Sequence, residues 1–329
     1  MKARYLITGG AGYVGSHLVA EMLNRDADCV VLDNLSTGHA GAVLEGARLI
    51  VGDLADNELL NRVLADGPWS AVFHFASLSL VGESMADPLR YLRENIGIGL
   101  RLIEACISHG VKRFVLSSTA ALFNDRAQNP ITEDSPIVPG SPYGESKWAL
   151  ERALGWAERV HGLRSACLRY FNAAGCDPAG RLGEDHDPET HLIPLAIDAA
   201  LGRRAGIAVY GSDYPTPDGS CIRDFIHVSD LADAHLRALG RLDHGSVHYN
   251  LAAGTGHSVL EVIRTVERVS GRKIATRMAA RRPGDPAVLI ASSARIASET
   301  GWVPRLSALD RIIETAVNWR ESHPHGYAD

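Results

Sequence analysis

The chain has 329 residues, of which 46% are hydrophobic and 22% charged, and its net charge is −6 at pH 7. This length suits one large α/β domain with a smaller second lobe, and an acidic chain without a basic stripe excludes general nucleic-acid binding. No stretch reaches the ~18 apolar residues of a membrane span. Because the five cysteines form no C-x-x-C pair, we expect reduced thiols and a cytoplasmic protein.

The first half of the chain alternates short apolar runs with longer amphipathic segments. The apolar runs predict strands at residues 5–7, 29–33, 48–51, 71–75, 114–116 and 165–170. The amphipathic segments predict helices at residues 13–23, 88–109 and 142–161. This alternation predicts an α/β fold with a doubly wound, Rossmann-type parallel sheet.

The second half has a looser pattern, which predicts a smaller C-terminal lobe. Residues 175–190 and 211–220 are polar and contain several Gly and Pro residues, a composition typical of loops. A later apolar run at residues 249–251 is a candidate to return to the sheet.

A glycine motif follows the first predicted strand and opens the first predicted helix. Gly9, Gly12 and Gly15 have the spacing G-x-x-G-x-x-G. The first glycine permits a tight turn, the second lets the backbone approach a pyrophosphate, and the third lets the helix pack on the sheet. Free N–H groups at the helix N-terminus then favour phosphate. The motif predicts a dinucleotide-binding site, and a simple glycine-rich turn is the alternative.

Carboxylates end the next two predicted strands. Asp33 can accept hydrogen bonds from both hydroxyls of an adenosine ribose, and it would repel a 2′-phosphate, so it favours NAD over NADP. A solvated turn residue is the alternative for Asp33. Asp53 is a candidate for hydrogen bonding to the adenine. We therefore expect an NAD-binding domain at residues 1–174, with a return of the chain near residues 225–252, and a substrate-binding lobe at residues 175–329.

A tyrosine and a lysine share one face of the third predicted helix. Tyr143 and Lys147 have the spacing Y-x-x-x-K, so their side chains lie side by side. Free tyrosine has a pKa near 10, and we expect the lysine ammonium and a positive nicotinamide ring to lower it. Thr119 follows the fifth predicted strand, at the sheet edge where ligands bind. These three are the candidate catalytic residues, although the spacing alone would also suit a surface pair.

These glycines, Thr119, Tyr143 and Lys147 resemble those of the extended short-chain dehydrogenases/reductases. The fuller resemblance is to the UDP-glucose (UDP-galactose) 4-epimerase family, and it covers nearly the whole chain. The motifs that carry it are TGGAGYVGSH at 8–17, DNLSTG at 33–38, VGES at 81–84, LRYFN at 168–172, YGSDYPTPDG at 210–219, RDFIH at 223–227 and RRPGD at 281–285. The motifs of the second half make the resemblance specific, because the first half alone would fit many nucleotide-sugar enzymes.

The resemblance implies a binding site for each of two ligands. NAD contacts are implied, beside the glycines, for Tyr13, Val14, Asp33, Asn34, Asp53, Leu54, Phe75, Ala76, Asn95, Tyr143, Lys147 and Phe171. Contacts to a UDP-sugar are implied for Thr119, Tyr143, Asn172, Leu192, Tyr210, Arg223, Arg282 and Asp285. Paired N–H groups of arginine suit diphosphate oxygens. For Arg223 the alternative is a salt bridge to Asp224 or Asp230, and for Asp285 it is a cap on the turn after residues 283–284.

Three positions depart from the pattern of many relatives. Ser79 stands where they carry Lys, which we expect to loosen the hold on the cofactor. Residues 122–124 are Leu-Phe-Asn in place of Val-Tyr-Gly after the fifth strand. Leu289 stands where some relatives carry a bulky Tyr near the sugar 2-position, so the preferred sugar stays open between a hexose, an N-acetylhexosamine and a pentose.

The activity that the resemblance implies is C4 epimerisation of UDP-glucose and UDP-galactose through a 4-keto sugar, with NAD kept bound. A UDP-N-acetylglucosamine or UDP-xylose 4-epimerase is the alternative, followed by an NAD-dependent sugar-nucleotide dehydrogenase. A 4,6-dehydratase typically carries an Asp-Glu pair after Thr119, where this chain has Ala120 and Ala121. A non-enzymatic NAD sensor could dispense with the tyrosine and lysine.

We expect no metal site and no membrane or nucleic-acid partner. His186, Asp187, Glu189 and His191 occur in one segment, but the two histidines lack a helical i, i+4 spacing and the segment has the composition of a polar surface loop. The resemblance implies a homodimer formed by the two long helices of the first half. Leu100, Ile103 and Ile107 would give the first of these helices an apolar stripe, and the core is the alternative place for them.

Overall fold

The computed structural model describes residues 2–123, 129–282 and 285–328, and its largest element is a seven-stranded sheet. The sheet has the order β10-β6-β5-β4-β1-β2-β3, and all of its neighbours are parallel. Its strands are β1 (Arg4–Thr8), β2 (Asp28–Asp33), β3 (Ala47–Val51), β4 (Ala71–His74), β5 (Arg113–Ser117), β6 (Arg164–Tyr170) and β10 (Val247–Leu251). The predicted Rossmann-type sheet is confirmed.

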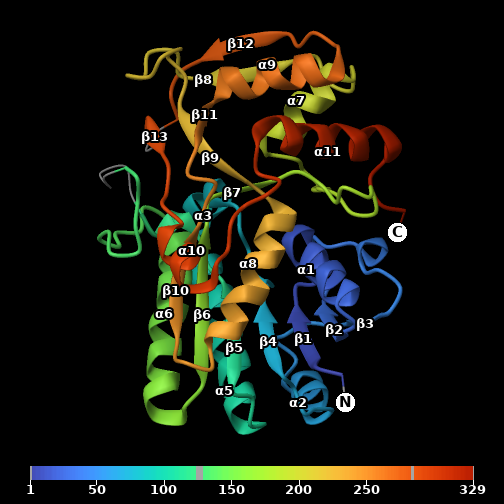
Figure 1. Cartoon of the computed structure of the whole chain (residues 1–329), viewed down its shortest axis with the longest axis vertical. Coiled ribbons are helices and arrows are strands. Elements are labelled where there is room, and N and C mark those ends of the chain that lie inside the picture. Colours follow the sequence, from blue (N-terminus) through green and yellow to red (C-terminus); the bar gives the residue numbers. More distant parts are fainter. Residues whose placement is uncertain (1, 124–128, 283–284, 329) are drawn as a thin grey trace.

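Helices cover both faces of this sheet (Figure 1). Alternate strand residues point to opposite faces, so Ile7 packs in a cluster with α1 and α8, whereas Leu6 packs in a second cluster with α2, α5 and α6. The helices are α1 (Tyr13–Asn24), α2 (Asn57–Ala65), α5 (Gly97–Ser108), α6 (Pro142–His161) and α8 (Val228–Arg241). Two buried faces explain why the strands are almost continuously apolar.

The strand order reverses between β1 and β4. The chain winds outward from β1 through β2 to β3, and then from β4 through β5 to β6. The first loops of the two halves therefore diverge, and ligands bind in the crevice that opens at the carboxyl ends of the strands. The glycine turn after β1 and the loops after β4 and β5 all lie at this edge.

The single helix predicted at residues 88–109 is instead three consecutive pieces. It consists of α4 (Pro88–Tyr91), a wider π turn η2 (Leu92–Ile96) and α5. The π turn carries Asn95, which is buried and donates from Nδ2 to the Ser146 hydroxyl of α6 at 3.0 Å. Such widened turns are frequent at functional sites. Hydrophobic periodicity alone did not reveal this one, because the apolar stripe continues through it.

The smaller lobe is built around β9, which crosses it below α9 in Figure 1. β9 pairs with β7, β11 and β13, and a separate pair joins β8 to β12. The strands are β7 (Asn172–Ala174), β8 (Ile207–Tyr210), β9 (Ile222–His227), β11 (Gly256–Ser258), β12 (Thr276–Ala279) and β13 (Val288–Leu289). The principal helices of the lobe are α7 (Leu192–Ala200), α9 (Val259–Ser270) and α11 (Leu309–Ser322). Apolar residues of these helices and of β7–β9 form one buried cluster.

The chain returns to the large sheet after it has begun the smaller lobe. α8 packs beside α1, and β10 then pairs with the free edge of β6, with Val247 opposite Ala166. Short elements complete the fold: α3 (Val81–Ala86), α10 (Ala294–Thr300), and the turns η1 (Ala40–Ala42) and η3 (Ala120–Leu122). The division into domains at residue 174 remains a proposal.

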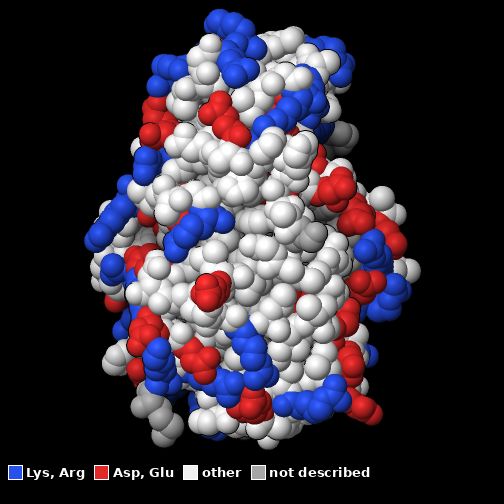
Figure 2. Space-filling model, turned by 90° about the vertical axis from the view of Figure 1, so that its right-hand side faces the viewer, with Lys and Arg blue, Asp and Glu red and all other residues white. Residues whose placement is uncertain are grey.

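The cysteines, the helices and the surface charge bear on the expectations drawn from composition. All five cysteines are buried, free thiols. None of the described helices combines the length and the apolar character that a membrane crossing demands. On the face shown in Figure 2, positive and negative side chains are interspersed and uncharged surface occupies much of the centre.

Candidate active site

The turn between β1 and α1 has no room for a side chain at Gly9 or at Gly15. Gly9 has a φ of +73°, and a Cβ there would lie 2.3 Å from the Ala76 backbone nitrogen. A Cβ at Gly15 would lie 2.3 Å from the Gly9 carbonyl oxygen. Gly12 is the N-cap of α1, and no side chain caps that helix. The first N–H groups of α1, from Tyr13, Val14 and Gly15, are therefore left for an anionic ligand, and this cradle fits a dinucleotide pyrophosphate.

The acidic residues predicted at the ends of β2 and β3 form one connected edge. Asp33 is buried and accepts hydrogen bonds from the backbone N–H groups of Ala11 and Leu35 at 2.9 and 3.0 Å. Asn34 donates from its amide to the Asp53 carboxylate at 2.9 Å. Asp33 thus ties the glycine turn to the end of β2, which places a carboxylate next to the position expected for the adenosine ribose.

The remaining residues predicted to contact NAD border the same crevice. Phe75 and Ala76 follow β4, and their N–H groups donate to the Thr8 carbonyl at 2.8 and 3.1 Å. The Asn95 side chain accepts from the Leu78 N–H and donates to the Leu78 carbonyl, so it fixes the loop after β4. Leu54 is buried, and Phe171 is partly buried between β6 and β7.

Thr119, Tyr143 and Lys147 come together at the carboxyl edge of β5. All three side chains are buried. The Thr119 hydroxyl lies near enough to the Tyr143 phenol to lower its pKa, and it accepts from the Ala121 N–H at 3.1 Å. The Lys147 ammonium lies 5.9 Å from the centre of the Tyr143 ring and donates to the Ser117 carbonyl at 2.8 Å. One helix and one strand end therefore hold a phenol, a hydroxyl and an amine in a fixed arrangement.

Burial governs the acid–base behaviour of this group. It lowers the pKa of Lys147 to about 7, although the nearby Glu151 carboxylate acts in the opposite direction. Burial also raises the pKa of Tyr143 above its usual value of 10.0, and the Thr119 hydrogen bond opposes that rise. The expected lowering of the Tyr143 pKa by Lys147 is therefore wrong for the protein alone, because desolvation is the stronger effect and the ammonium donates to a carbonyl instead.

Gly144 is a functional position that the sequence analysis passed over. A Cβ on Gly144 would lie 2.2 Å from the Ala121 carbonyl oxygen. The absence of a side chain lets the first turn of α6 approach η3 closely, which brings Tyr143 to Thr119. The Ser141 hydroxyl fixes the same turn, because it accepts from the Gly144 N–H at 3.2 Å. No spacing rule identified this glycine, since its partner lies on another element.

A second layer of buried polar groups supports Lys147. Glu151 lies one helical turn beyond it and accepts from the Ser118 hydroxyl and the Arg169 guanidinium. Arg169 comes from β6, so the carboxylate connects α6 to two strands. The i, i+4 spacing of residues 143, 147 and 151 was a signal in the sequence that could have found Glu151.

Two residues predicted to bind the UDP-sugar, Arg223 and Asp285, meet in the smaller lobe. Arg223 on β9 forms an ion pair with Asp285, and its guanidinium also donates to the Ile222 carbonyl at 2.7 Å. The alternative partners proposed for Arg223 are wrong. Asp224 instead accepts from the N–H groups of residues 253, 254 and 291, and Asp230 from the N–H groups of residues 305 and 306. The turn at residues 283–284 lies outside the described residues.

The other predicted substrate contacts come from β8, β7, α7 and the segment before Asp285. The Arg282 guanidinium stacks over the Tyr210 ring at 4.1 Å from its centre. Asn172 at the start of β7 donates to the Asp224 carbonyl at 2.8 Å, and Leu192 begins α7. Recognition of the ligand would thus draw on several segments, each held by its own strand or helix.

The three positions that depart from the pattern of many relatives differ in their burial. Ser79 is exposed. Leu122 and Phe123 are buried in a cluster with Ile131, whereas Asn124 lies outside the described residues. Leu289 on β13 packs against this cluster and pairs in register with Arg223. Leu289 therefore lies between the predicted diphosphate site and the floor of the crevice.

A glycine turn fitted to a pyrophosphate, a carboxylate at the end of β2, a buried threonine after β5 and a buried tyrosine and lysine on α6 define an extended short-chain dehydrogenase/reductase. Residues 5–252 match the NAD dependent epimerase/dehydratase family. The UDP-glucose 4-epimerase of Lacticaseibacillus casei is 47% identical to the chain over 325 residues, which cover 98% of each protein.

Solved structures agree with the sequence comparison. A crystal structure of UDP-glucose 4-epimerase superposes with a TM-score of 0.96 at 45% identity and covers 99% of this chain and 100% of that chain. The UDP-glucose 4-epimerase from Bifidobacterium longum, solved in complex with NAD+ and UDP, superposes with a TM-score of 0.92 at 35% identity and covers 99% and 100% of the two chains. The chain belongs to the NAD-dependent epimerase/dehydratase family, within its group of UDP-glucose 4-epimerases.

Proposed function

We propose that this protein catalyses the reversible C4 epimerisation of a UDP-hexose, UDP-glucose to UDP-galactose, with NAD held in the crevice of the large sheet. The observation that carries the proposal is the buried group of Tyr143, Thr119 and Lys147 near a turn in which Gly9 and Gly15 admit no side chain. The family supplies the reaction class, and the B. longum relative was crystallised with NAD+ and UDP.

NAD would be held by the residues that the crevice already orients. The free N–H groups at the start of α1 face the pyrophosphate, and Asp33 accepts from the adenosine ribose. Asn34, Asp53 and Leu54 border the adenine side. Phe75, Ala76, Asn95 and Phe171 line the path toward the reacting centre. Bound NAD supplies the acceptor and the donor for the hydrogen at sugar C4, so the sugar passes through a 4-keto form.

Tyr143 is the proposed base and acid of the reaction. Its phenolate removes the proton from the sugar 4-hydroxyl and later returns it. Thr119 hydrogen-bonds the same sugar oxygen, which keeps it within reach of the phenol. Lys147 stabilises the phenolate once the cofactor ring and the substrate have replaced the water around it. Because the proton and the hydrogen both return, the reaction has no net redox change.

The smaller lobe is proposed to grip the nucleotide and leave the sugar free to turn. Arg223 and Arg282 bind the diphosphate through paired N–H groups, and Asp285 orients Arg223 and accepts from the uridine ribose. Asn172, Leu192 and Tyr210 complete the site. The keto sugar then rotates about the bonds of the diphosphate linker and presents its other face to the cofactor, which inverts C4.

The test is to incubate purified protein separately with UDP-galactose, UDP-N-acetylgalactosamine and UDP-xylose and to identify the products by chromatography. We expect UDP-glucose from the first without accumulation of free NADH. Stoichiometric release of NADH would contradict the proposal and favour a dehydrogenase. Products from the other two substrates would show how far the small Leu289 widens the choice of sugar.

We further propose a homodimer formed by α5 and α6, which pack against each other in one subunit. Ile103 is buried in the core, so the predicted apolar stripe is wrong for that residue. Leu100 on α5, and Trp156 and Val160 on α6, are exposed instead, with Trp156 at 62%. Exposed apolar side chains on two neighbouring helices suit a second copy of the chain. Light scattering should give a dimer for the native protein and a monomer for Trp156→Glu.

The same proposal includes the cellular compartment of the protein and the boundaries of its two domains. Five buried free thiols fit the reducing cytoplasm. Residues 1–174, with the returning segment near 225–252, would form the NAD-binding domain. Residues 175–329 would supply most of the UDP-sugar lobe.

A further inference from the structure

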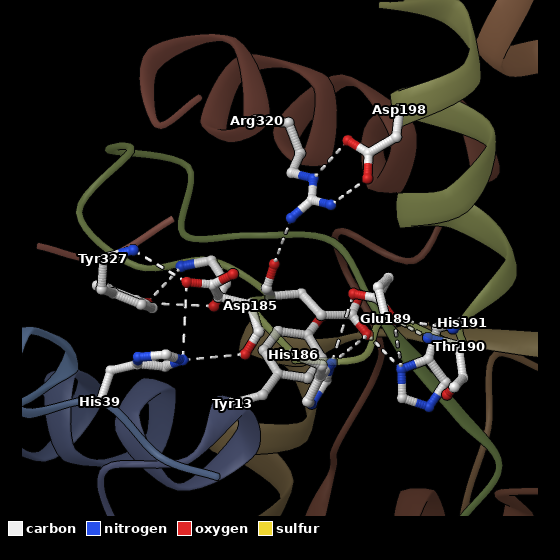
Figure 3. Close-up of polar contacts among 12 residues, drawn as sticks. Tyr13, His39, Asp185, His186, Glu189, Thr190, His191, Asp198, Arg320 and Tyr327 are labelled. Atoms are coloured by element: carbon white, nitrogen blue, oxygen red, sulfur yellow. Dashed lines mark hydrogen bonds and ion pairs between the residues drawn. The ribbon is translucent and has the colours of Figure 1, made fainter. Parts of the chain in front are cut away.

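One segment of the smaller lobe gathers four potential metal ligands outside the proposed catalytic group. Glu184, His186, Glu189 and His191 lie between β7 and α7, and one ligand atom from each falls within 4.8 Å of all the others. Figure 3 shows His186, Glu189 and His191 turned toward one another. Two imidazoles and two carboxylates form a ligand set that zinc and similar transition metals accept.

The separations between the ligand atoms approach those of a tetrahedral site. His186 Nδ1 lies 3.6 Å from Glu184 Oε1 and 3.6 Å from Glu189 Oε2. Atoms bound at 2.0–2.2 Å to a tetrahedral zinc ion are about 3.3–3.6 Å apart. His191 Nδ1 and Glu184 Oε1 are closer, at 2.7 Å, and a bound ion would widen this separation.

Two of the four ligand atoms are buried without a partner within the described part of the chain, although His191 faces both carboxylates. The side chains of Glu184 and Glu189 are only 5% and 9% exposed. His186 Nδ1 and Glu189 Oε2 are buried and have no hydrogen-bond partner among the described residues, whereas Glu184 Oε1 faces His191 Nδ1 at 2.7 Å. Buried charges are normally paired, hydrogen-bonded or bound to metals. The expectation of a polar surface loop is therefore wrong for the two glutamates.

The local backbone holds the ligands in place before any ion binds. Glu189 Oε1 accepts from the N–H groups of Thr190 and His191, each at 2.8 Å, which leaves Oε2 directed at His186. His191 is the N-cap of α7, so its backbone is fixed by that helix. Tyr13 at the start of α1 packs edge-on against the His186 ring, with the ring centres 6.1 Å apart.

A second group, Glu151 with Cys167 and His248, is a weaker candidate. Both Glu151 oxygens already accept from Arg169, and one of them also accepts from Ser118. Burial raises the pKa of Cys167 well above its ordinary value, which keeps it a thiol, whereas a metal needs the thiolate.

We propose that Glu184, His186, Glu189 and His191 bind one divalent transition-metal ion of the zinc type. Four protein ligands fill a tetrahedral site, so the ion has a structural role and offers no open position for catalysis. It stabilises the segment at residues 184–191, which contacts Tyr13 at the cofactor crevice through His186 and leads into α7 at Leu192. Occupancy therefore stiffens the wall between the proposed cofactor and substrate sites.

The experiment uses untagged full-length protein that has been treated with EDTA and dialysed. Equilibrium dialysis against zinc, read by mass spectrometry of the metal, should give one ion per chain. Zinc should raise the Tm of the protein and EDTA should reverse the rise. Co2+ should give the intense visible bands of a tetrahedral site without a thiolate charge-transfer band, which distinguishes this cluster from the one that contains Cys167.

Two ligand variants and one control complete the test. His186→Asn and Glu189→Gln should each weaken zinc binding by about 100-fold or more, since even outer-shell partners are worth 10–100-fold. His244→Asn removes an exposed histidine outside the cluster and should bind zinc like the wild type. Failure of the wild type to bind one equivalent, unchanged binding in both ligand variants, or a thiolate band with Co2+ would overturn the proposal. If the variants do not fold, the wild-type stoichiometry and Co2+ spectrum still decide it.

Discussion

The proposed catalytic group and the proposed nucleotide grip are built in different ways. Thr119, Tyr143 and Lys147 are at most 9% exposed and come from one strand end and one helix. Arg223 and Asp285 lie in separate segments of the smaller lobe, and only the pairing of β9 with β13 brings their regions together. Tyr210, whose ring stacks with the Arg282 guanidinium, is 37% exposed.

This difference follows from the chemistry that each region performs. Proton transfer needs reacting atoms held at fixed distances in a dry environment, and a packed sheet edge provides that. Binding a flexible nucleotide while its sugar turns needs strong contacts at the diphosphate and freedom beyond it. Residues drawn from several segments can close around the ligand without holding the sugar ring.

The sharpest test of the catalytic half is Tyr143→Phe. The variant keeps the buried ring and loses only the hydroxyl that contacts Thr119, so the fold should survive. We expect kcat for UDP-galactose to fall by about 10²–10⁴-fold, the usual worth of a general acid–base group. Circular dichroism and NAD content should match the wild type. Near-normal turnover would refute the role of Tyr143.

The two arginines of the proposed nucleotide grip should contribute unequally to UDP affinity. Arg223→Ala leaves the partly buried Asp285 without its partner, so we expect UDP binding to weaken by about 100-fold, roughly 3 kcal/mol. Arg282→Ala removes a cation stacked on Tyr210 and should cost about 10-fold or less. Calorimetry with UDP measures both. Equal losses would contradict the ranking drawn from the ion pair.

The buried Lys147 should leave a signature in the pH dependence of stability. Its pKa is about 7 in the folded protein and 10.5 ordinarily. Between these values the unfolded chain binds a proton that the folded protein does not, so this group makes the free energy of unfolding rise with pH. Below pH 7 its contribution is constant. In urea unfolding, the free energy of unfolding of the wild type should rise relative to that of Lys147→Met from pH 7 to pH 9. A relative stability that does not change with pH would argue against a neutral buried amine.

The smallest expected effect concerns the choice of sugar. Leu289 borders the floor of the crevice, and Leu289→Tyr would fill space there. We expect the ratio of kcat/KM for UDP-galactose over UDP-N-acetylgalactosamine to rise by about 10-fold, typical of one steric contact. The matched control is Leu289→Met, which preserves volume. An unchanged ratio in the tyrosine variant would place the sugar 2-position elsewhere.

The catalytic group could be predicted from the sequence more fully than the contacts of the nucleotide grip. The i, i+4 spacing and the strand-end rule placed Tyr143, Lys147 and Thr119 from local patterns alone. The partner of Arg223 was not local, so proximity in the sequence suggested Asp224 or Asp230, whereas Asp285 arrives through strand pairing. Resemblance named Asp285 as a site residue without naming its partner.

Two further features needed the folded structure because they depend on neighbours distant in the sequence. The closeness of α6 to η3 depends on Gly144 meeting the Ala121 carbonyl. The burial of Glu184 and Glu189 depends on packing around the segment that follows β7. Periodicity likewise predicted a single helix at residues 88–109, since a π turn does not interrupt the apolar stripe.

The late return of β10 to the sheet has a consequence for synthesis of the protein. A ribosome releases β6 long before β10, so the nascent chain carries an unpaired, apolar strand edge while the smaller lobe is being made. Such edges readily pair with other chains. Shielding of this edge until β10 has been made would therefore limit aggregation during translation.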